Sequence, residues 1–295
     1  MEKEKFVKRF REISFSPKDI DPTECVLTFR KIASKYNENI DYEPNKVYSN
    51  GVYTYFYKPY EGYSTALDMN SAYLFALSQK LADWESRREI TPSEVFKKEY
   101  DFYSFENPLH CEMYYKEDME RMKAAMLWSE TKIYGYKGKN YYPNTIKELY
   151  RLKGINKEKY KNVANIAVGC MHKHSGKQNN TTIAASLYAW FAWYIDSLVV
   201  KFTKKGYNVI MITTDSIKIA GKYNPEDNIV TIGDGLGEFK VEFEGEAKFY
   251  SSGHYEDSSI KWKGKPMYLI EGNRRCQFID NLKEEKKIYD KFAIF

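Results

Sequence analysis

The strongest hydrophobic pattern in the chain predicts one long helix over residues 181–204. Apolar side chains recur there at the three- and four-residue spacing of a helix. Asn180, Thr181 or Thr182 can cap its start, and Gly206 follows its end. Because the apolar positions are dense around the helix, we expect it to be buried at the centre of the fold.

Two short apolar strands follow this helix, at residues 209–212 and 217–220. The four residues between them, from Thr213 to Ser216, read Thr-Thr-Asp-Ser. A short polar turn between two apolar strands predicts a β-hairpin. Asp215 then lies at the tip of that hairpin.

The region before the long helix contains further strand patterns. Residues 47–57 alternate and carry the strong turn signal Asn-Gly, which predicts a hairpin. Residues 65–69 predict another strand, and residues 70–88 then take helical spacing. Asp68 therefore lies where a strand turns into a helix.

The remaining segments are more polar and less regular. We expect residues 91–160 to be mostly helical, with one helix beginning at Pro143, because proline favours the first turn. A further helix is predicted over residues 160–173. Residues 222–260 predict loops and short strands, and residues 261–295 a small charged segment.

Composition narrows the class of protein. The chain has 295 residues, of which 43% are hydrophobic, and its formal net charge is +5. This apolar content excludes disorder as the main state. No uninterrupted apolar stretch reaches the roughly 18 residues of a membrane-spanning helix, and the charged start of the chain does not fit a secretory signal.

Cysteine and tyrosine usage add little on function. The four Cys are scattered without a C-x-x-C pair, which argues against a zinc ribbon or a thioredoxin site and fits a reducing cytosol. The 27 Tyr residues suit base stacking on nucleic acid. They equally suit an A/T-rich coding bias, so both explanations stay open.

The acid at the hairpin tip is the first candidate for chemistry. Mg²⁺ prefers oxygen ligands and usually takes one or two protein carboxylates. Asp68 is the best second acid, since it lies at another strand end. The alternative is that Asp68 only caps a helix and Asp215 only shapes a turn.

Four segments in order carry a family resemblance. Residues 68–73 read D-M-N-S-A-Y, similar to motif A, D-x-N-S-L-Y-P. Residues 161–169 read K-N-V-A-N-I-A-V-G, similar to motif B, K-x-x-x-N-S-x-Y-G. Residues 213–216 are similar to motif C, D-T-D-S, and residues 48–51 to a Y-x-G-G element. The chain thus resembles the family B DNA polymerases, most closely the protein-primed phage and plasmid branch.

The resemblance implies a role for each matched residue. Asp68 and Asp215 would be catalytic and, with the backbone of Met69, would hold Mg²⁺ or Mn²⁺. Tyr73 matches the ring that packs under the nucleotide sugar and rejects a 2′-hydroxyl. The other residues expected to bind dNTP are Lys161, Lys157, Asn165, Gly169, Ser71 and Asn70. The residues expected to contact DNA are Tyr48, Asn50, Gly51, Lys248 and Tyr255.

The chain departs from the family pattern at several positions. Thr213 stands in place of the first motif C acid, Leu74 in place of a proline, and Val168 in place of the motif B tyrosine. The lysine of the primer-gripping K-x-Y element is missing near Tyr255, where Lys248 is expected to substitute. These changes predict altered metal and primer binding.

The resemblance implies an α+β right-hand polymerase fold, with an antiparallel-sheet palm, helical fingers and a small thumb. We expect the palm at residues 47–83 and 175–260, the fingers at 84–174 and the thumb at 261–295. The N-terminal segment, residues 1–46, leaves no room for a proofreading exonuclease, so a shortened form is expected.

The expected function is that of a DNA-directed DNA polymerase without proofreading. Its partners would be primer–template DNA and dNTPs, with a priming or processivity protein in addition. We expect a monomer without membrane association, in the cytoplasm of a host cell if the source is a phage or other mobile element. The alternatives are a primase or terminal transferase on the same palm, or a non-catalytic DNA-binding relic.

Overall fold

The computed structural model describes residues 47–48, 54–106, 111–127, 130–160, 163–172, 181–251, 254–257, 268–271 and 274–277. The chain divides into two compact units. We call Val52–Asn70 with Ile195–Phe295 the hairpin unit, and Met1–Gly51 with Ser71–Tyr194 the mixed unit.

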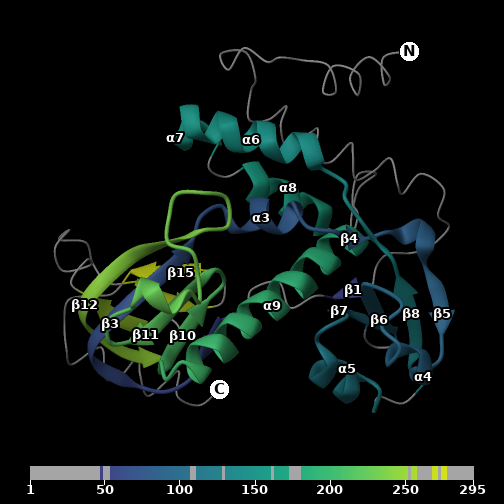
Figure 1. The fold of residues 1–295 in the computed structure, drawn as a ribbon, viewed down its shortest axis with the longest axis horizontal. Coiled ribbons are helices and arrows are strands. Elements are labelled where there is room, and N and C mark those ends of the chain that lie inside the picture. The colour runs from purple at the N-terminus through teal and green to yellow at the C-terminus, as the bar shows by residue number, and fades with distance from the viewer. Residues whose placement is uncertain are drawn as a thin grey trace. The chain divides into compact units, whose positions relative to one another are not determined.

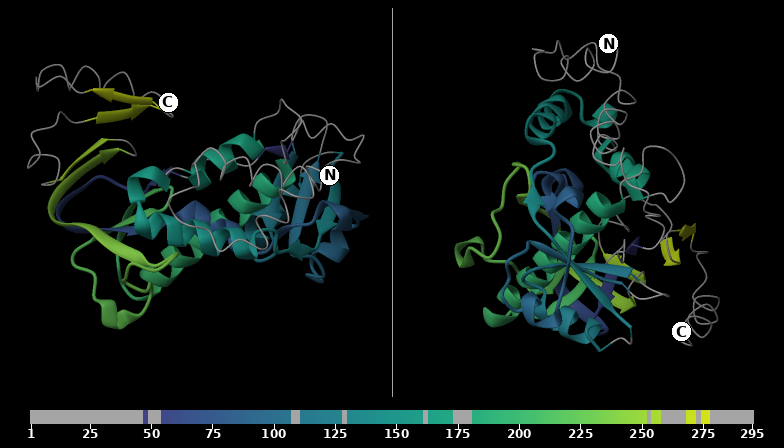
Figure 2. Two further views of the ribbon diagram at one scale, coloured as in Figure 1. Left: turned by 90° about the horizontal axis from the view of Figure 1, so that it is seen from above. Right: turned by 90° about the vertical axis from the view of Figure 1, so that its right-hand side faces the viewer.

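The hairpin unit is built on a six-stranded antiparallel sheet (Figure 1). Its strands, in spatial order, are β13 (His254–Asp257), β12 (Phe239–Ser251), β3 (Tyr60–Met69), β11 (Ser216–Ala220), β10 (Val209–Thr213) and β2 (Thr54–Phe56). The β12 strand carries a bulge between Val241 and Phe243. A separate two-stranded ribbon, β14 (Tyr268–Glu271) with β15 (Arg274–Gln277), is visible in Figure 2.

The central strands of this sheet are apolar because they are buried. Leu67, Ile210 and Ile217 have no exposed surface. Phe202, near the end of the long helix α9 (Thr181–Lys204), packs its ring against Tyr207. Burial of such side chains is worth about 1.5–3 kcal/mol each, so this core fixes the position of the strand ends.

The mixed unit contains a five-stranded sheet and several short helices. Its strands, in spatial order, are β1 (Val47–Tyr48), β7 (Cys111–Tyr115), β6 (Phe102–Glu106), β8 (Lys132–Tyr136) and β5 (Arg88–Ile90). The helices α4 (Pro92–Val95) and α5 (Met119–Ala125) contribute Val95, Met122 and Ala125 to a core that includes Tyr103 and Phe105.

The remaining helices of the mixed unit are α3 (Ala72–Leu77), α6 (Pro143–Ile155), α7 (Lys157–Tyr160) and α8 (Val163–His172). The α9 helix begins in this unit and ends in the hairpin unit. By length and composition α9 could cross a membrane, but core helices pass the same test. Its side chains Leu187, Ile195 and Phe202 are fully buried, which fits the predicted core helix.

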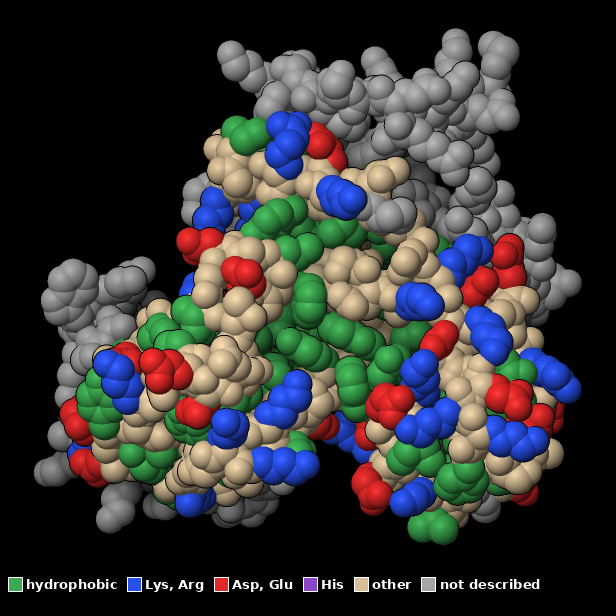
Figure 3. Space-filling view, in the orientation of Figure 1, with side chains coloured by type: hydrophobic (Ala, Val, Ile, Leu, Met, Phe, Trp, Pro, Cys, Tyr) green, Lys and Arg blue, Asp and Glu red, His purple; other side chains and the backbone are tan. Residues whose placement is uncertain are grey.

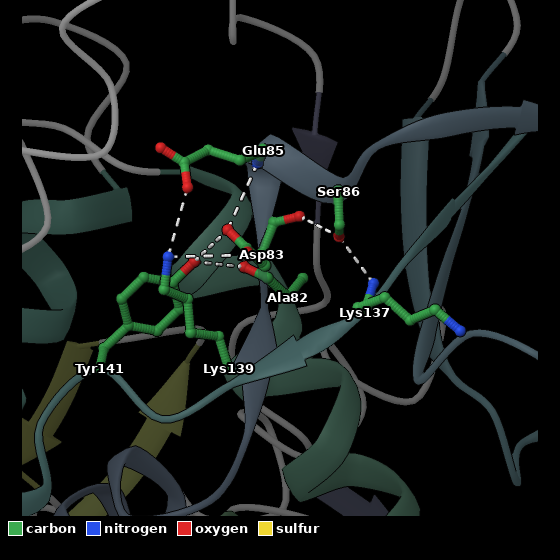
Figure 4. A network of polar contacts seen from close by, with 7 residues as sticks. All are labelled: Ala82, Asp83, Glu85, Ser86, Lys137, Lys139 and Tyr141. Carbon is green, nitrogen blue, oxygen red and sulfur yellow. Dashed lines mark hydrogen bonds and ion pairs between the residues drawn. The ribbon is translucent and has the colours of Figure 1, made fainter.

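A polar network joins β4 (Leu81–Ala82) and the following 3-10 turn to β9 (Gly138–Lys139) (Figure 4). The Tyr141 hydroxyl donates to the Ala82 carbonyl at 3.0 Å, and the Ser86 hydroxyl donates to the Asp83 carbonyl at 2.6 Å. The Lys139 ammonium lies between two carboxylates, 3.7 Å from Asp83 and 3.3 Å from Glu85. The network fixes the chain where α3 has ended.

Several sequence predictions are confirmed. The long helix has the predicted bounds, Thr181–Lys204, and α6 begins at Pro143. The β10–β11 hairpin forms with Asp215 in its turn. The predicted strand at residues 65–69 is the end of β3. The described part of 160–173 is helical as α8.

Other predictions are wrong. Residues 47–57 do not form one hairpin, because β1 pairs with β7 in one sheet and β2 pairs with β10 in another. The alternation identifies strands but not their partners. The helix predicted over 70–88 ends at Leu77. Residues 222–260 contain loops and the short strand β13 as predicted, but also β12, a strand of 13 residues that was not predicted.

The middle of the chain is the largest correction. Residues 91–160 were expected to be mostly helical, but β6, β7 and β8 all lie in this span. Their sequences FYSFE, CEMYY and KIYGY are rich in aromatic residues, which pack well on a pleated sheet. The span 84–174, which was expected to be helical throughout, therefore combines strands with the helices α4, α5, α6, α7 and α8.

Candidate active site

Asp68 and Asp215 lie at neighbouring strand ends in the hairpin unit. Asp68 is the last but one residue of β3, directly opposite Ser216 of β11. The Met69 backbone N–H donates to the Asp215 carbonyl at 3.1 Å. The structure thus brings together the two acids that the sequence predicted as a pair.

The turn that carries Asp215 has an unusual backbone. Thr214 has a φ of 55°, in the left-handed region. A β-branched residue is disfavoured there, so the turn is held by the two strands that flank it. The turn places Asp215 between β10 and β11, where its carbonyl accepts from Met69 at the end of β3.

Four polar side chains form a row across the sheet, one from each of four adjacent strands. The register pairs Thr213 with Ser216, Ser216 with Asp68, and Asp68 with Lys240. Residues paired in this way point to the same face of a sheet. The Lys240 ammonium is 2.7 Å from the Asp68 carboxylate, and the Asp68 side chain is only 19% exposed.

Sequence reasoning missed Lys240. The residue lies outside the three motifs, and only the register of β12 against β3 places it beside Asp68. The sequence FKVEF shows strand alternation at this point. That alternation gives no indication of which strand lies alongside.

The electrostatics of the acid pair are unfavourable in the absence of a cation. Burial, together with the nearby charges of Asp68 and Glu242, raises the pKa of the Asp215 carboxyl to about 6. Burial acts to lower the pKa of Lys240. The hydrogen bond to Asp68 and the surrounding negative charges outweigh burial and raise it.

The donor atoms fit a hard divalent cation. The two acids lie at the ends of neighbouring strands, and the buried Ser216 hydroxyl has no hydrogen-bond partner among the residues the structure describes. In that same part of the chain no three His, Cys, Asp or Glu side chains cluster as a metal site. Mg²⁺ commonly takes one or two protein carboxylates and completes its shell with water and phosphate, so Asp68 and Asp215 suffice.

Asn70 holds a glycine-rich loop far downstream in the sequence, at residues 233–237. Its side-chain amide donates to the Gly233 carbonyl at 2.6 Å. Its backbone N–H donates to the Glu238 carbonyl, and its own carbonyl accepts from the Gly237 N–H. A Cβ atom at Gly235 would lie 2.6 Å from the Glu238 carboxyl carbon, which explains the glycine there. The nucleotide-binding role of Asn70 stays a prediction.

Ser71 and Tyr73 lie in the mixed unit, at the start of α3. Ser71 caps the helix with a φ of 56°, and its hydroxyl is hydrogen-bonded to the Lys153 ammonium. The Tyr73 ring packs edge-on against Tyr188 of α9, with 6.0 Å between centroids. Burial raises the pKa of Tyr188, and a hydrogen bond with Tyr73 offsets part of that rise. Tyr188 is therefore a supporting residue that sequence reasoning missed.

The described motif B residues are divided between the buried and the exposed face of α8. Val163, Ala167 and Val168 are buried, whereas Asn165 and Gly169 are exposed. A Cβ atom at Gly169 would meet nothing within 4 Å. This open face agrees with a residue that leaves room for a ligand. Lys157 is exposed on α7, and Lys161 lies outside the described residues.

The predicted DNA contacts stay predictions. Lys248 forms an ion pair with Glu61 across two strands, and the Tyr255 ring stacks on Phe249 with 5.5 Å between centroids. Tyr48 lies in β1, and nothing is described of its side chain; Asn50 and Gly51 lie outside the described residues. On the face in Figure 3, acidic and basic side chains are interspersed among the coloured residues.

Neither a protein-family model nor a curated protein sequence matches the chain. Solved structures do match it. Phi29 DNA polymerase with primer-template DNA superposes with a TM-score of 0.58 at 14% identity, covering 88% of this chain and 57% of the polymerase. The phi29 complex that also contains incoming nucleotide gives a TM-score of 0.57 at 15% identity, covering 90% of this chain and 61% of the polymerase.

The family B DNA polymerase of the archaeon Pyrobaculum calidifontis matches with a TM-score of 0.43 at 16% identity, over 90% of this chain and 34% of that one. That score is too low to support an argument. The phi29 matches show that the chain shares the polymerase fold of mixed helices and antiparallel sheet. The chain spans about three fifths of the length of phi29 polymerase.

Proposed function

We propose that this chain is a DNA-directed DNA polymerase of family B type. It would transfer a nucleotide from a dNTP to a primer 3′-hydroxyl and release pyrophosphate. The observation that carries this proposal is the position of Asp68 and Asp215 at neighbouring strand ends. The shared fold with phi29 DNA polymerase supports it.

Asp68 and Asp215, with the backbone carbonyl of Met69, would hold Mg²⁺ or Mn²⁺. When bound, two such ions would lower the pKa of the primer hydroxyl and stabilise charge on the phosphates. The protein's own part is to present ionised carboxylates at a fixed spacing. In the metal-free protein the pKa of Asp215 is raised to about 6, so protons compete with the cation and we expect cation affinity to fall as the pH drops.

The predicted nucleotide contacts belong to the same proposal. Lys157 and Lys161 would bind the triphosphate as point charges. The exposed face of α8, with Asn165 and Gly169, would line the nascent base pair. Tyr73, braced by Tyr188, would pack under the sugar. Ser71 and Asn70 complete the proposed dNTP-binding set.

The proposed DNA contacts are Tyr48, Asn50, Gly51, Lys248 and Tyr255. The assignment of residues 84–174 as fingers and 261–295 as thumb belongs to the same proposal, as do the palm segments. Lack of proofreading is a further prediction. It is tested by incubating the protein with a primer whose 3′ end is mismatched: the mismatched nucleotide should not be removed.

Primer extension on a recessed template tests the main proposal. The wild-type protein should extend the primer with Mg²⁺ or Mn²⁺, and Asp68→Asn and Asp215→Asn should each abolish extension. Asp227→Asn is the matched control, since Asp227 pairs with Lys205 on another edge of the same unit. Extension that survives both site variants would refute the assignment of the metal ligands.

A non-catalytic DNA-binding relic is the second candidate. Thr213 in place of an acid and the Lys240 ion pair both reduce the negative charge at the site. A relic would bind DNA but show no metal-dependent dNTP binding. A primase or terminal transferase would instead extend with ribonucleotides or without a template in the same assay.

A further inference from the structure

Lys240 and Asp68 form an ion pair at the site proposed for the divalent cation. They lie directly opposite each other in β12 and β3, with 2.7 Å between the Lys240 nitrogen and the Asp68 carboxylate. Asp68 is half-buried, and Lys240 keeps 42% of its side chain exposed. The ammonium therefore has an open path to solvent while it contacts the half-buried acid.

Ser216 is the second observation, on the other side of Asp68. It lies directly opposite Asp68 in β11, where facing Cβ atoms are about 4.5–5.5 Å apart. Its hydroxyl is buried and unpaired within the described part of the chain. An unpaired buried hydroxyl is unfavourable, so another position of the Asp68 carboxylate would satisfy it.

Lys218, the other lysine near this site, makes different contacts. The Lys218 ammonium lies 3.4 Å from the Thr213 hydroxyl and 4.8 Å from the centre of the Tyr255 ring. Lys240 is thus the lysine that contacts Asp68 in the observed arrangement. The charge of the Lys240 ammonium also favours the ionised form of Asp215 and so acts to lower the pKa of that carboxyl.

We propose that Lys240 is a resident cation that competes with the divalent metal for Asp68. Its ammonium holds the Asp68 carboxylate in the metal-free protein. Metal binding displaces it, and Asp68 then accepts a hydrogen bond from Ser216. The inference rests on the cation site proposed above. It makes Lys240 a positioning residue that stabilises the metal-free state and sets the metal concentration required.

Mn²⁺ binding to the full chain, measured by electron paramagnetic resonance of the free ion, tests this directly. Lys240→Met should bind Mn²⁺ at least about tenfold more tightly than wild type, because one competing charge is removed next to the site. Lys240→Arg keeps the charge and should stay close to wild type. Lys222→Met is the matched control, since Lys222 pairs with Glu244 on the same unit at 3.3 Å.

Thermal unfolding gives a second readout, in which the melting temperature should change in opposite directions without and with metal. In EDTA, Lys240→Met should melt at a lower temperature than wild type, because two carboxylates are left facing each other. With saturating Mn²⁺ its melting temperature should rise by more than that of wild type. Ser216→Ala should raise the EDTA value, because the unpaired buried hydroxyl is removed, and should weaken Mn²⁺ binding. If Lys240→Met does not fold, Lys240→Gln provides the same comparison.

Unchanged or weaker Mn²⁺ affinity in Lys240→Met, or no Mn²⁺ binding in any variant, would overturn the proposal. The polymerase proposal fails separately. If Asp68→Asn removes Mn²⁺ binding from Lys240→Met but wild type extends no primer, the role of Lys240 stands without polymerase activity. If wild type extends primers and Lys240→Met leaves Mn²⁺ affinity unchanged, only the role of Lys240 is refuted.

Discussion

Replacing Asp215 with asparagine should stabilise the metal-free protein while destroying its proposed function. The native state holds this carboxyl with a pKa of about 6, against an ordinary value of 3.8. Each tenfold change in proton affinity corresponds to roughly 1.36 kcal/mol. The full rise therefore corresponds to about 3 kcal/mol of unfavourable interaction above pH 6.

The direction of the pH dependence follows because Asp215 binds its proton more tightly in the folded than in the unfolded chain. Folded Asp215 takes up a proton at a higher pH than the unfolded chain does, so acidification favours the native state in this window. Wild-type stability should fall as pH rises from about 4 through 6 and then level off. Asparagine carries no charge, so the variant should lose this dependence and be more stable at pH 8 by about 1–3 kcal/mol.

Urea denaturation in EDTA at several pH values measures both effects. Asp227→Asn is the control: its carboxylate accepts a hydrogen bond from Tyr207 at 2.5 Å and pairs with Lys205. That variant should lose stability or stay unchanged. If Asp215→Asn is equal to or less stable than wild type at pH 8, the strain attributed to the acid pair does not exist.

Four further changes test other parts of the structure. Thr214→Asn should raise the free energy of unfolding by about 0.5–1 kcal/mol, because asparagine tolerates the left-handed backbone, φ 55°, better than threonine. Gly169→Ala should stabilise α8 by up to about 1 kcal/mol, since its Cβ meets nothing within 4 Å, yet raise the KM for dNTP in primer extension. Asn70→Ala should lower stability in urea by about 1–2 kcal/mol, because the glycine-rich loop loses its 2.6 Å hydrogen bond. Tyr188→Phe should weaken discrimination against ribonucleotides, measured as the ratio of kcat/KM values, because Tyr73 loses a hydrogen bond.

Each of these has an outcome that contradicts it. A destabilised Thr214→Asn would show that the threonine side chain supports the turn. Unchanged KM in Gly169→Ala would remove the exposed face of α8 from the nucleotide site. Asn70→Ala with wild-type stability would mean that the loop is held elsewhere. For Tyr188→Phe, unchanged discrimination would leave Tyr73 to act without its neighbour.

Local patterns in the sequence predict the part of the site that is built locally. The β10–β11 hairpin and α9 come from contiguous segments with strong periodicity, and both form as expected. Asp68 and Asp215 were paired because the strand pattern placed both at strand ends, and the motif resemblance supported the pair. Adjacent pairing of β3 with β11 confirms that they are neighbours.

The predictions that failed concern strands whose pairing partners lie far away in the sequence. Lys240 reaches Asp68 only through the register of β12, a strand that the sequence predicted as loops and short pieces. β1 and β2 show the same failure, since each pairs outside the predicted hairpin. Short aromatic segments such as FYSFE satisfy neither period clearly, so the sheet of the mixed unit was missed.

The pairing of β3 with two strands from much later in the sequence affects folding during synthesis. Both of its neighbours, β11 and β12, are encoded far downstream; the Thr65 hydroxyl bonds to a carbonyl 156 positions later. At about 5–20 residues per second, the ribosome needs on the order of 10–30 s to synthesise that span. Throughout this time an apolar strand has two open edges, a known route to aggregation. The central sheet can therefore close only late in translation, which makes chaperone supply during synthesis a determinant of yield.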